Sequence, residues 1–219
     1  MTSSRASARS AGRVGEREAL RTVEWGLATR RRRGEAMNGD LGVVTVLPGG
    51  VLVAAIDGLG HGGEAARAAR EAGEVVRNRA SEDLVALIER CHDALRNTRG
   101  AVIGLAFVSH LRRTMTWLGV GNVEGLVLGR DRSGPRPKGW LPLGRGVLGH
   151  ELPSVRPTTL DVRPGDVLIL ATDGIEGAFA DSPDISGSAQ DISERILAVH
   201  WKPIDDALVL AVRYVGARP

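Results

Sequence analysis

Two stretches of the chain, VLVAAIDG at residues 51–58 and VLILATDG at residues 167–174, resemble each other and decide how the rest is interpreted. Each begins with an uninterrupted apolar run of the length typical of a strand buried on both faces. Each ends with an aspartate followed by glycine. A single Asp-Gly pair is typical of a turn, because both residues are favoured there. Its repetition after two buried strands instead predicts carboxylates held together at a buried edge.

Two further acidic positions also lie beside apolar segments, but they stand before the segment instead of after it. Asp40 directly precedes the apolar run 41–47, and Asp205-Asp206 directly precede the run 207–215. Clustered carboxylates repel one another and lose hydration when buried, so several at one buried edge require cations. A donor set made only of oxygen atoms favours Mg²⁺ or Mn²⁺ over zinc. Two such ions about 3.5–4 Å apart activate water against phosphate esters, so the aspartates predict a hydrolytic metal site.

The hydrophobic periodicity predicts strands, two helices, more strands, one helix and a last strand. Strands are predicted at 23–29, 41–47, 51–56, 101–109, 114–120, 123–128, 167–172 and 207–215. Helices are predicted over 65–76, over 84–95 with Ser81 as the cap and Cys91 on the buried face, and over 189–200. This order favours an α+β fold in which two mainly antiparallel sheets pack together with helices outside.

Two cationic segments are candidates for contact with a partner. Residues 129–149 are rich in Gly, Pro and Arg, which predicts a long exposed loop or flap. Its cations form a candidate recognition surface for a substrate: Arg130, Arg132, Arg136, Lys138 and Arg145. The run Arg30 to Arg33 is either an exposed loop or a nucleic-acid contact. No aromatic residues interleave with that run to stack on bases, so we expect no nucleic-acid partner.

The composition is that of one globular domain. The chain has 219 residues, of which 42% are hydrophobic and 25% charged, enough to build one sizeable core. We expect residues 1–19 to be a flexible N-terminal extension and residues 20–216 to be a single domain. No apolar run approaches the ~20 residues of a membrane span. The single cysteine can form no internal disulfide, which favours a reducing compartment and predicts a cytoplasmic protein.

Taken in order, the acidic motifs resemble those of a known family. They are Gly34-Glu35 with Asn38-Gly39-Asp40, DGLGHG at 57–62, RPGD at 163–166 with ATDGI at 171–175, and Asp205-Asp206-Ala207. The pattern resembles the PPM family of metal-dependent serine/threonine phosphatases, in particular its SpoIIE-like bacterial branch, over about residues 20–215. The short chain and the segment GVGN at 119–122 resemble the RsbX-type stressosome phosphatases. The resemblance implies a four-layer α-β-β-α sandwich with a two-metal site between the sheets.

The resemblance also implies roles for individual residues. Asp57 would be the catalytic residue that positions a metal-activated water, and it would bridge two divalent ions, Mn²⁺ or Mg²⁺. The remaining metal ligands would be Asp40, the backbone carbonyl of Gly58, Asp173 and Asp206. Asp206 is preferred to Asp205 because the family pattern uses the aspartate immediately before the small residue.

Two departures from the family pattern concern the general acid and the arginine that binds the phosphate. Eukaryotic-type relatives carry a histidine, a proposed general acid, directly after the Asp-Gly. Leu59 stands there in this chain, and His61 lies two residues further on without being assigned that role. Those relatives also place a phosphate-binding arginine before the first acidic motif. Arg33 is the candidate for substrate binding here, and Asn122 is either a turn residue or a polar group near the site.

The function implied by the resemblance is removal of phosphate from phosphoserine or phosphothreonine in STAS-domain stress-signalling regulators. A metal-activated water would attack the phosphate, and phosphorylated STAS-domain proteins, in a stressosome-like complex, would be the partners. We expect no membrane partner. The alternative is a non-catalytic module that has the phosphatase fold and binds a phosphoprotein without hydrolysing it. The presence of all four acidic motifs favours the enzyme.

Overall fold

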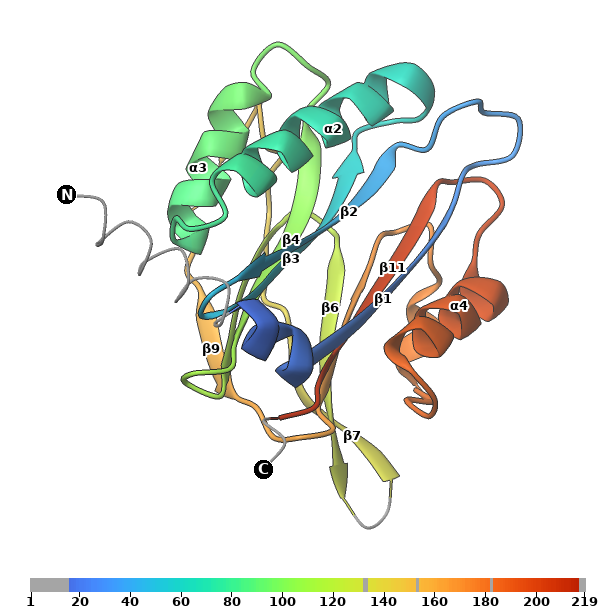
Figure 1. Cartoon of the computed structure of the whole chain (residues 1–219). Coiled ribbons are helices and arrows are strands. Elements are labelled where there is room, and N and C mark those ends of the chain that lie inside the picture. The colour runs from blue at the N-terminus through green and yellow to red at the C-terminus, as the bar shows by residue number, and fades with distance from the viewer. Residues whose placement is uncertain (1–15, 132–133, 153, 182, 217–219) are drawn as a thin grey trace, which may run out of the picture.

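The computed structural model describes residues 16–131, 134–152, 154–181 and 183–216, and its strands form two facing sheets (Figure 1). One sheet consists, in spatial order, of β1 (Val23–Arg30), β11 (Ala207–Tyr214), β10 (Val167–Ala171), β6 (Glu124–Asp131) and β7 (Gly134–Trp140). The other consists of β2 (Asp40–Leu47), β3 (Gly50–Gly58), β4 (Ala101–Ser109), β5 (Thr114–Val120) and β8 (Leu143–Gly144), with β9 (Thr158–Asp161) also paired to β5. The β5–β8 pair is parallel and the other pairs are antiparallel within the described residues. The prediction of mainly antiparallel sheets is confirmed.

Helices cover the outer face of each sheet (Figure 1). The helices α2 (Gly62–Asn78) and α3 (Leu84–Ala94) pack on the sheet that contains β3. The helix α4 (Ala189–His200) and the short 3-10 helix η1 (Gly177–Ala180) pack on the sheet that contains β11. The layers are therefore helix, sheet, sheet and helix, which confirms the predicted four-layer sandwich.

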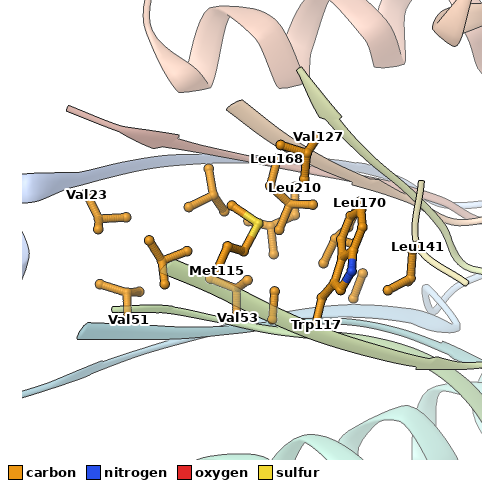
Figure 2. Packing of buried hydrophobic residues seen from close by; sticks show 14 of the residues in the cluster. Val23, Val51, Val53, Met115, Trp117, Val127, Leu141, Leu168, Leu170 and Leu210 are labelled. Atoms are coloured by element: carbon orange, nitrogen blue, oxygen red, sulfur yellow. The ribbon is translucent and has the colours of Figure 1, made fainter. Parts of the chain in front are cut away.

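An apolar core fills the space between the two sheets. Figure 2 shows Met115 and Trp117 of β5 reaching toward Leu168, Leu170 and Leu210 of the facing sheet. All five side chains are at most 1% exposed. Because inner-face residues of both sheets interdigitate in such a core, the sheets are held in one orientation. The ends of strands from the two sheets can then form a common site.

The segment predicted as a long loop or flap over 129–149 is instead mostly strand. β6 continues to Asp131 and pairs with β7 as an antiparallel hairpin. Pro135 and Pro137 favoured a loop in the sequence, but β7 is the edge strand of its sheet, where a missing N–H is tolerated. The side chain of Lys138 forms an ion pair with Asp166, which is 4% exposed. The hairpin is thus tied to the body of the domain.

Two smaller predictions also need correction. Ser81 does not cap α3: the carboxylate of Asp83 accepts hydrogen bonds from the backbone N–H groups of Val85 and Ala86. At the N-terminal end, residues 16–22 are helical and Ala19 is fully buried, so the ordered structure begins before residue 20. The rest of the expected flexible extension, 1–15, lies outside the described residues. Among those described, no helix is both long and apolar enough to cross a membrane.

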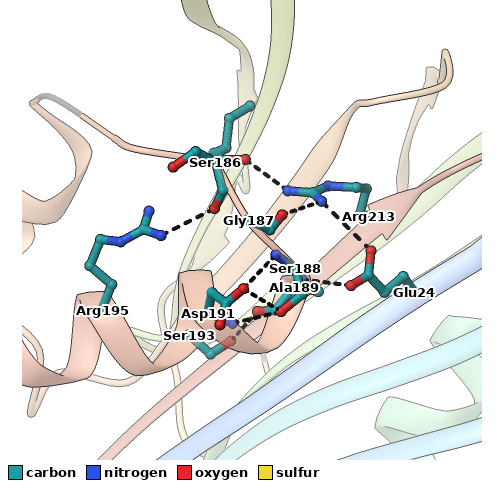
Figure 3. Close-up of polar contacts among 10 residues, drawn as sticks. Glu24, Ser186, Gly187, Ser188, Ala189, Asp191, Ser193, Arg195 and Arg213 are labelled. Atoms are coloured by element: carbon teal, nitrogen blue, oxygen red, sulfur yellow. Dashed lines mark hydrogen bonds and ion pairs between the residues drawn. The ribbon is translucent and has the colours of Figure 1, made fainter.

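The segment that leads into α4 is fixed by a polar network (Figure 3). Ser188 and Asp191 form a capping box at the start of the helix. The guanidinium of Arg213 donates to the backbone carbonyl oxygens of Ile185 and Gly187. The carboxylate of Glu24 accepts from the backbone N–H of Ala189 at 2.8 Å. These contacts attach α4 to β1 and β11 and so stabilise this outer helical layer.

Candidate active site

The four acidic segments of the sequence meet at one end of the two sheets. Asp40 begins β2 and lies directly opposite Asp57 of β3 in the antiparallel register. Opposite residues in such a pair have Cβ atoms about 4.5–5.5 Å apart. From the facing sheet, the hydroxyl of Thr172, the residue directly after β10, donates to the carboxylate of Asp40 at 2.7 Å. One hydrogen bond therefore joins the acidic ends of the two sheets.

Each glycine of the two Asp-Gly pairs lies where two backbones approach closely. A Cβ on Gly58 would lie 2.0 Å from the carbonyl oxygen of Ala65 in α2. A Cβ on Gly174 would lie 1.7 Å from the carbonyl oxygen of Asp206. Real Cβ atoms essentially never approach other atoms within 3.0 Å. Glycine is therefore required here so that α2 and the segment before β11 can pack against the aspartates.

A pocket of about 550 Å³ collects side chains from both sheets at this end. Asp57 comes from β3, Asp173 from the turn after β10, and Asp205 from the turn before β11. The other lining residues are Arg32, Leu59, Gly60, His61, Val102, Gly121, Asn122, Arg145, Gly146 and Val147. Three carboxylates from distant parts of the chain thus line one pocket, together with two arginines and an imidazole.

Burial and mutual repulsion disfavour ionisation of these carboxylates. Burial raises the pKa of Asp57 above the ordinary aspartate value, and the charges of Asp40 and Asp173 raise it further. Burial also raises the pKa of Asp40, although the hydrogen bond from Thr172 acts in the opposite direction. The pKa of Asp205 is raised, again mainly by burial. A cation in the pocket would offset these effects, because an opposite charge favours the ionised form.

The donor set fits hard divalent cations that keep part of their water. In the part of the chain that the structure describes, no three acidic, histidine or cysteine side chains converge on one point as a complete metal shell. Mg²⁺ usually retains several waters and takes only one or two carboxylates from the protein. Asp57, Asp173 and Asp205 offer carboxylates of this kind in an open pocket. The residues present therefore fit Mg²⁺ or Mn²⁺.

The two adjacent aspartates before β11 have different surroundings. Asp206 is 3% exposed, and its two carboxylate oxygens accept hydrogen bonds from the backbone N–H groups of Arg32 and Gly39, both at 2.9 Å. Asp205 is the one that lines the pocket. The geometry therefore favours Asp205 over the predicted Asp206 as a cation ligand. Asp206 holds the loop between β1 and β2 in place.

The family described as Stage II sporulation protein E (SpoIIE) matches residues 48–215, most of the chain. The chain belongs to the SpoIIE family. It carries a phosphatase domain of the serine/threonine (PP2C) type, so the predicted enzyme class is confirmed.

Individual relatives support the same assignment. Phosphoserine phosphatase RsbX of Bacillus subtilis (strain 168) is 29% identical over 163 residues, which cover 74% of this chain and 78% of that protein. A solved chain from work on the bacterial stressosome superposes with a TM-score of 0.78 and 29% identity, covering 87% of this chain and 99% of that one. A crystal structure of RsbX with magnesium gives a TM-score of 0.73 and 26% identity, and the match covers 88% of this chain and 95% of that one.

The structure separates the candidate substrate-binding residues into two groups. The Nδ2 of Asn122 donates to the carboxylate of Asp173 at 2.8 Å, so Asn122 is a polar group of the site as well as a residue after β5. Arg33 is not among the residues that line the pocket, and its guanidinium lies 5.8 Å from the ring centroid of Trp201. Arg32 and Arg145 line it instead. The sequence indicated both cationic segments but could not show which arginines turn inward.

His61 is a further pocket residue that the sequence left without a role. It directly precedes α2, and its Nδ1 lies 2.6 Å from the Oε1 of Glu35. The family-like motif GE at residues 34–35 was the available signal for Glu35. Only the tertiary structure brings that carboxylate to an imidazole located after β3. The pocket residue His61 is therefore paired with a carboxylate.

Proposed function

We propose that this phosphatase removes phosphate from phosphoserine or phosphothreonine of STAS-domain regulators in a stressosome-like complex. The observation that carries the proposal is the pocket in which Asp57, Asp173 and Asp205 come together from both sheets. The likeness to a phosphoserine phosphatase and to a chain from the bacterial stressosome supports the choice of substrate. We further propose that residues 20–216, with the helix before them, act as one phosphatase domain in the cytoplasm.

The proposed cofactor is a pair of divalent ions, Mg²⁺ or Mn²⁺. The crystal structure of RsbX with magnesium supports this choice. When bound, such ions activate water and neutralise charge on the phosphoryl oxygens. Asp57, Asp173 and Asp205 would hold them, together with the backbone carbonyl of Gly58. Asp40 lies opposite Asp57 in the sheet and would support it from there, because the hydroxyl of Thr172 fixes the carboxylate of Asp40.

The chain's own cations would bind the substrate phosphate. Arg32 and Arg145 line the pocket, and neither forms an ion pair with a carboxylate among the described residues. An arginine fork matches phosphoryl oxygens in geometry and charge. Arg32 is held by its backbone N–H, which donates to Asp206. Arg145 follows β8, whose Gly144 carbonyl accepts from Gly121 at 2.7 Å. Both arginines are therefore attached to fixed backbone.

The test is hydrolysis of 4-nitrophenyl phosphate with Mn²⁺, with Mg²⁺ and with chelator. We expect activity that requires the metal and is mostly lost in Asp173→Asn and Asp205→Asn. Asp93→Asn is the matched control, because Asp93 is exposed on α3 and pairs only with Arg96 in the described structure. Site variants as active as this control would contradict the assignment.

The substrate class needs a second measurement. A phosphorylated STAS-domain protein should be hydrolysed with a higher kcat/KM than a short phosphopeptide with the same phosphosite. Equal values would refute recognition of the folded domain. Metal binding without turnover of either substrate would support the alternative, a module that binds phosphoproteins without hydrolysing them.

A further inference from the structure

The pair formed by His61 and Glu35 occupies a position in which it can take part in the reaction. His61 lines the same pocket as Asp57 and Asp173. Its imidazole is 47% exposed, whereas the carboxylate of Glu35 is 28% exposed. With the carboxylate oxygen as the acceptor, the Nδ1–H of the imidazole is the donor of the 2.6 Å contact. The other ring nitrogen, Nε2, is left for the substrate.

Glu35 is held in place by the loop between β1 and β2 and by the start of α2. Its backbone N–H donates to the carbonyl of Arg32 at 3.3 Å. Its Oε2 lies 2.8 Å from the position that a Cβ on Gly62 would take, and Gly62 has φ +74°. Glycine therefore leaves room for the carboxylate at the first residue of the helix. The N-terminal end of a helix also favours a negative charge, so this position suits a carboxylate.

No other proton donor of this type lines the pocket in the described structure. The Nδ1 of His92 accepts from the backbone of Gly149, and the Nε2 of His150 lies 3.0 Å from the carbonyl of Arg99. Neither of these histidines, nor His110 or His200, is among the pocket-lining residues. The pocket aspartates are needed for cations, and arginine does not release its proton. Histidine is the side chain most often used for proton transfer.

We propose that His61 is a catalytic general acid that protonates the leaving oxygen, with Glu35 as its positioning residue. The proposal rests on the proposed phosphatase function. Water forms the new P–O bond while the bond between phosphorus and the serine or threonine oxygen breaks. The electron pair of that bond goes to the leaving oxygen, which takes the proton from Nε2 of His61. The attacking water releases a proton to the solvent, and the imidazole regains one from it.

Leaving-group dependence distinguishes this role from a structural one. 4-Nitrophenolate is a stable anion that leaves without needing a proton, whereas the alkoxide of a phosphoserine peptide needs one. General acid catalysis typically contributes about 10²–10⁴-fold. We therefore expect His61→Gln to lower kcat on the phosphoserine peptide by roughly 10²-fold or more relative to its loss on 4-nitrophenyl phosphate. Glu35→Gln should shift the same ratio in the same direction by a smaller factor.

The controls separate the possible outcomes. His200→Gln is the matched variant, because His200 ends α4 and does not line the pocket. Equal losses on both substrates in His61→Gln, or no loss on the peptide, would overturn the proposal. If His61→Gln does not fold, as judged by thermal unfolding and Mn²⁺ binding, Glu35→Gln decides by the same ratio. A wild-type enzyme that hydrolyses neither of these substrates nor a phosphorylated STAS-domain protein would refute the proposed function itself, which is a distinguishable result.

Discussion

Replacement of Gly58 by alanine should damage the active site through packing alone. The new Cβ would lie 2.0 Å from the carbonyl oxygen of Ala65, about 1 Å closer than real Cβ atoms come to other atoms. The obstacle is helix backbone, which cannot rotate away as a side chain can. Overpacking of this kind costs about 1–3 kcal/mol. For a chain of this size each kcal/mol lowers Tm by about 2–4 °C, so a decrease of roughly 2–12 °C is expected.

The effect of Gly58→Ala on activity should exceed its effect on stability. Relief of the contact requires α2 to move away from β3, and the residue before α2 is His61, which lines the pocket. A displacement of about 1 Å in a catalytic constellation can cost about 10²-fold in rate. The assay is thermal unfolding together with metal-dependent hydrolysis of 4-nitrophenyl phosphate at a temperature where the variant is folded.

A neighbouring glycine on the same helix supplies the control for this prediction. A Cβ on Gly63 would meet only the Sδ of Met37, at 3.9 Å, so Gly63→Ala introduces no steric conflict. Alanine is favoured over glycine within a helix by roughly 0.5–1 kcal/mol. Gly63→Ala should therefore keep or slightly raise Tm and keep the activity. Wild-type stability and activity in Gly58→Ala would refute the reasoning.

Three further predictions follow from particular contacts. Arg145→Ala should raise KM for phosphopeptides by roughly 10–100-fold, since a charge-assisted hydrogen bond contributes about 1.5–3 kcal/mol; Arg156→Ala, outside the pocket, is the control in steady-state assays. In chelator, the raised pKa values of Asp40 and Asp57 mean that the folded state binds more protons than the unfolded one. Stability, measured by thermal unfolding, should then fall as pH rises above the ordinary aspartate pKa, and Mg²⁺ should reduce this fall. A stability that does not change with pH in chelator would contradict the prediction. Asp83→Ala should cost about 1 kcal/mol through loss of the cap of α3, whereas Ser81→Ala should leave denaturant unfolding unchanged.

Much of the architecture followed from patterns that are local in sequence. The buried strands β3 and β10 are continuous apolar runs, and α2 and α4 follow helical spacing. Such patterns determine which segments form strands or helices, because a buried strand and an amphipathic helix need different periodicities. These local patterns did not predict the β6–β7 hairpin. Its prolines are acceptable only because β7 is at a sheet edge, which is a property of the whole sheet.

The sequence by itself also predicted that aspartates from four segments would gather at one end of the buried strands, because each of them stands directly beside an apolar run. Only the tertiary structure decided which of them face the pocket. Asp205 and Asp206 are adjacent, and their opposite surroundings depend on backbone N–H groups of the β1–β2 loop, which belongs to the other end of the chain. The contact between His61 and Glu35 has the same origin. Side-chain direction at a site is decided by long-range packing and hydrogen bonding, which local sequence does not encode.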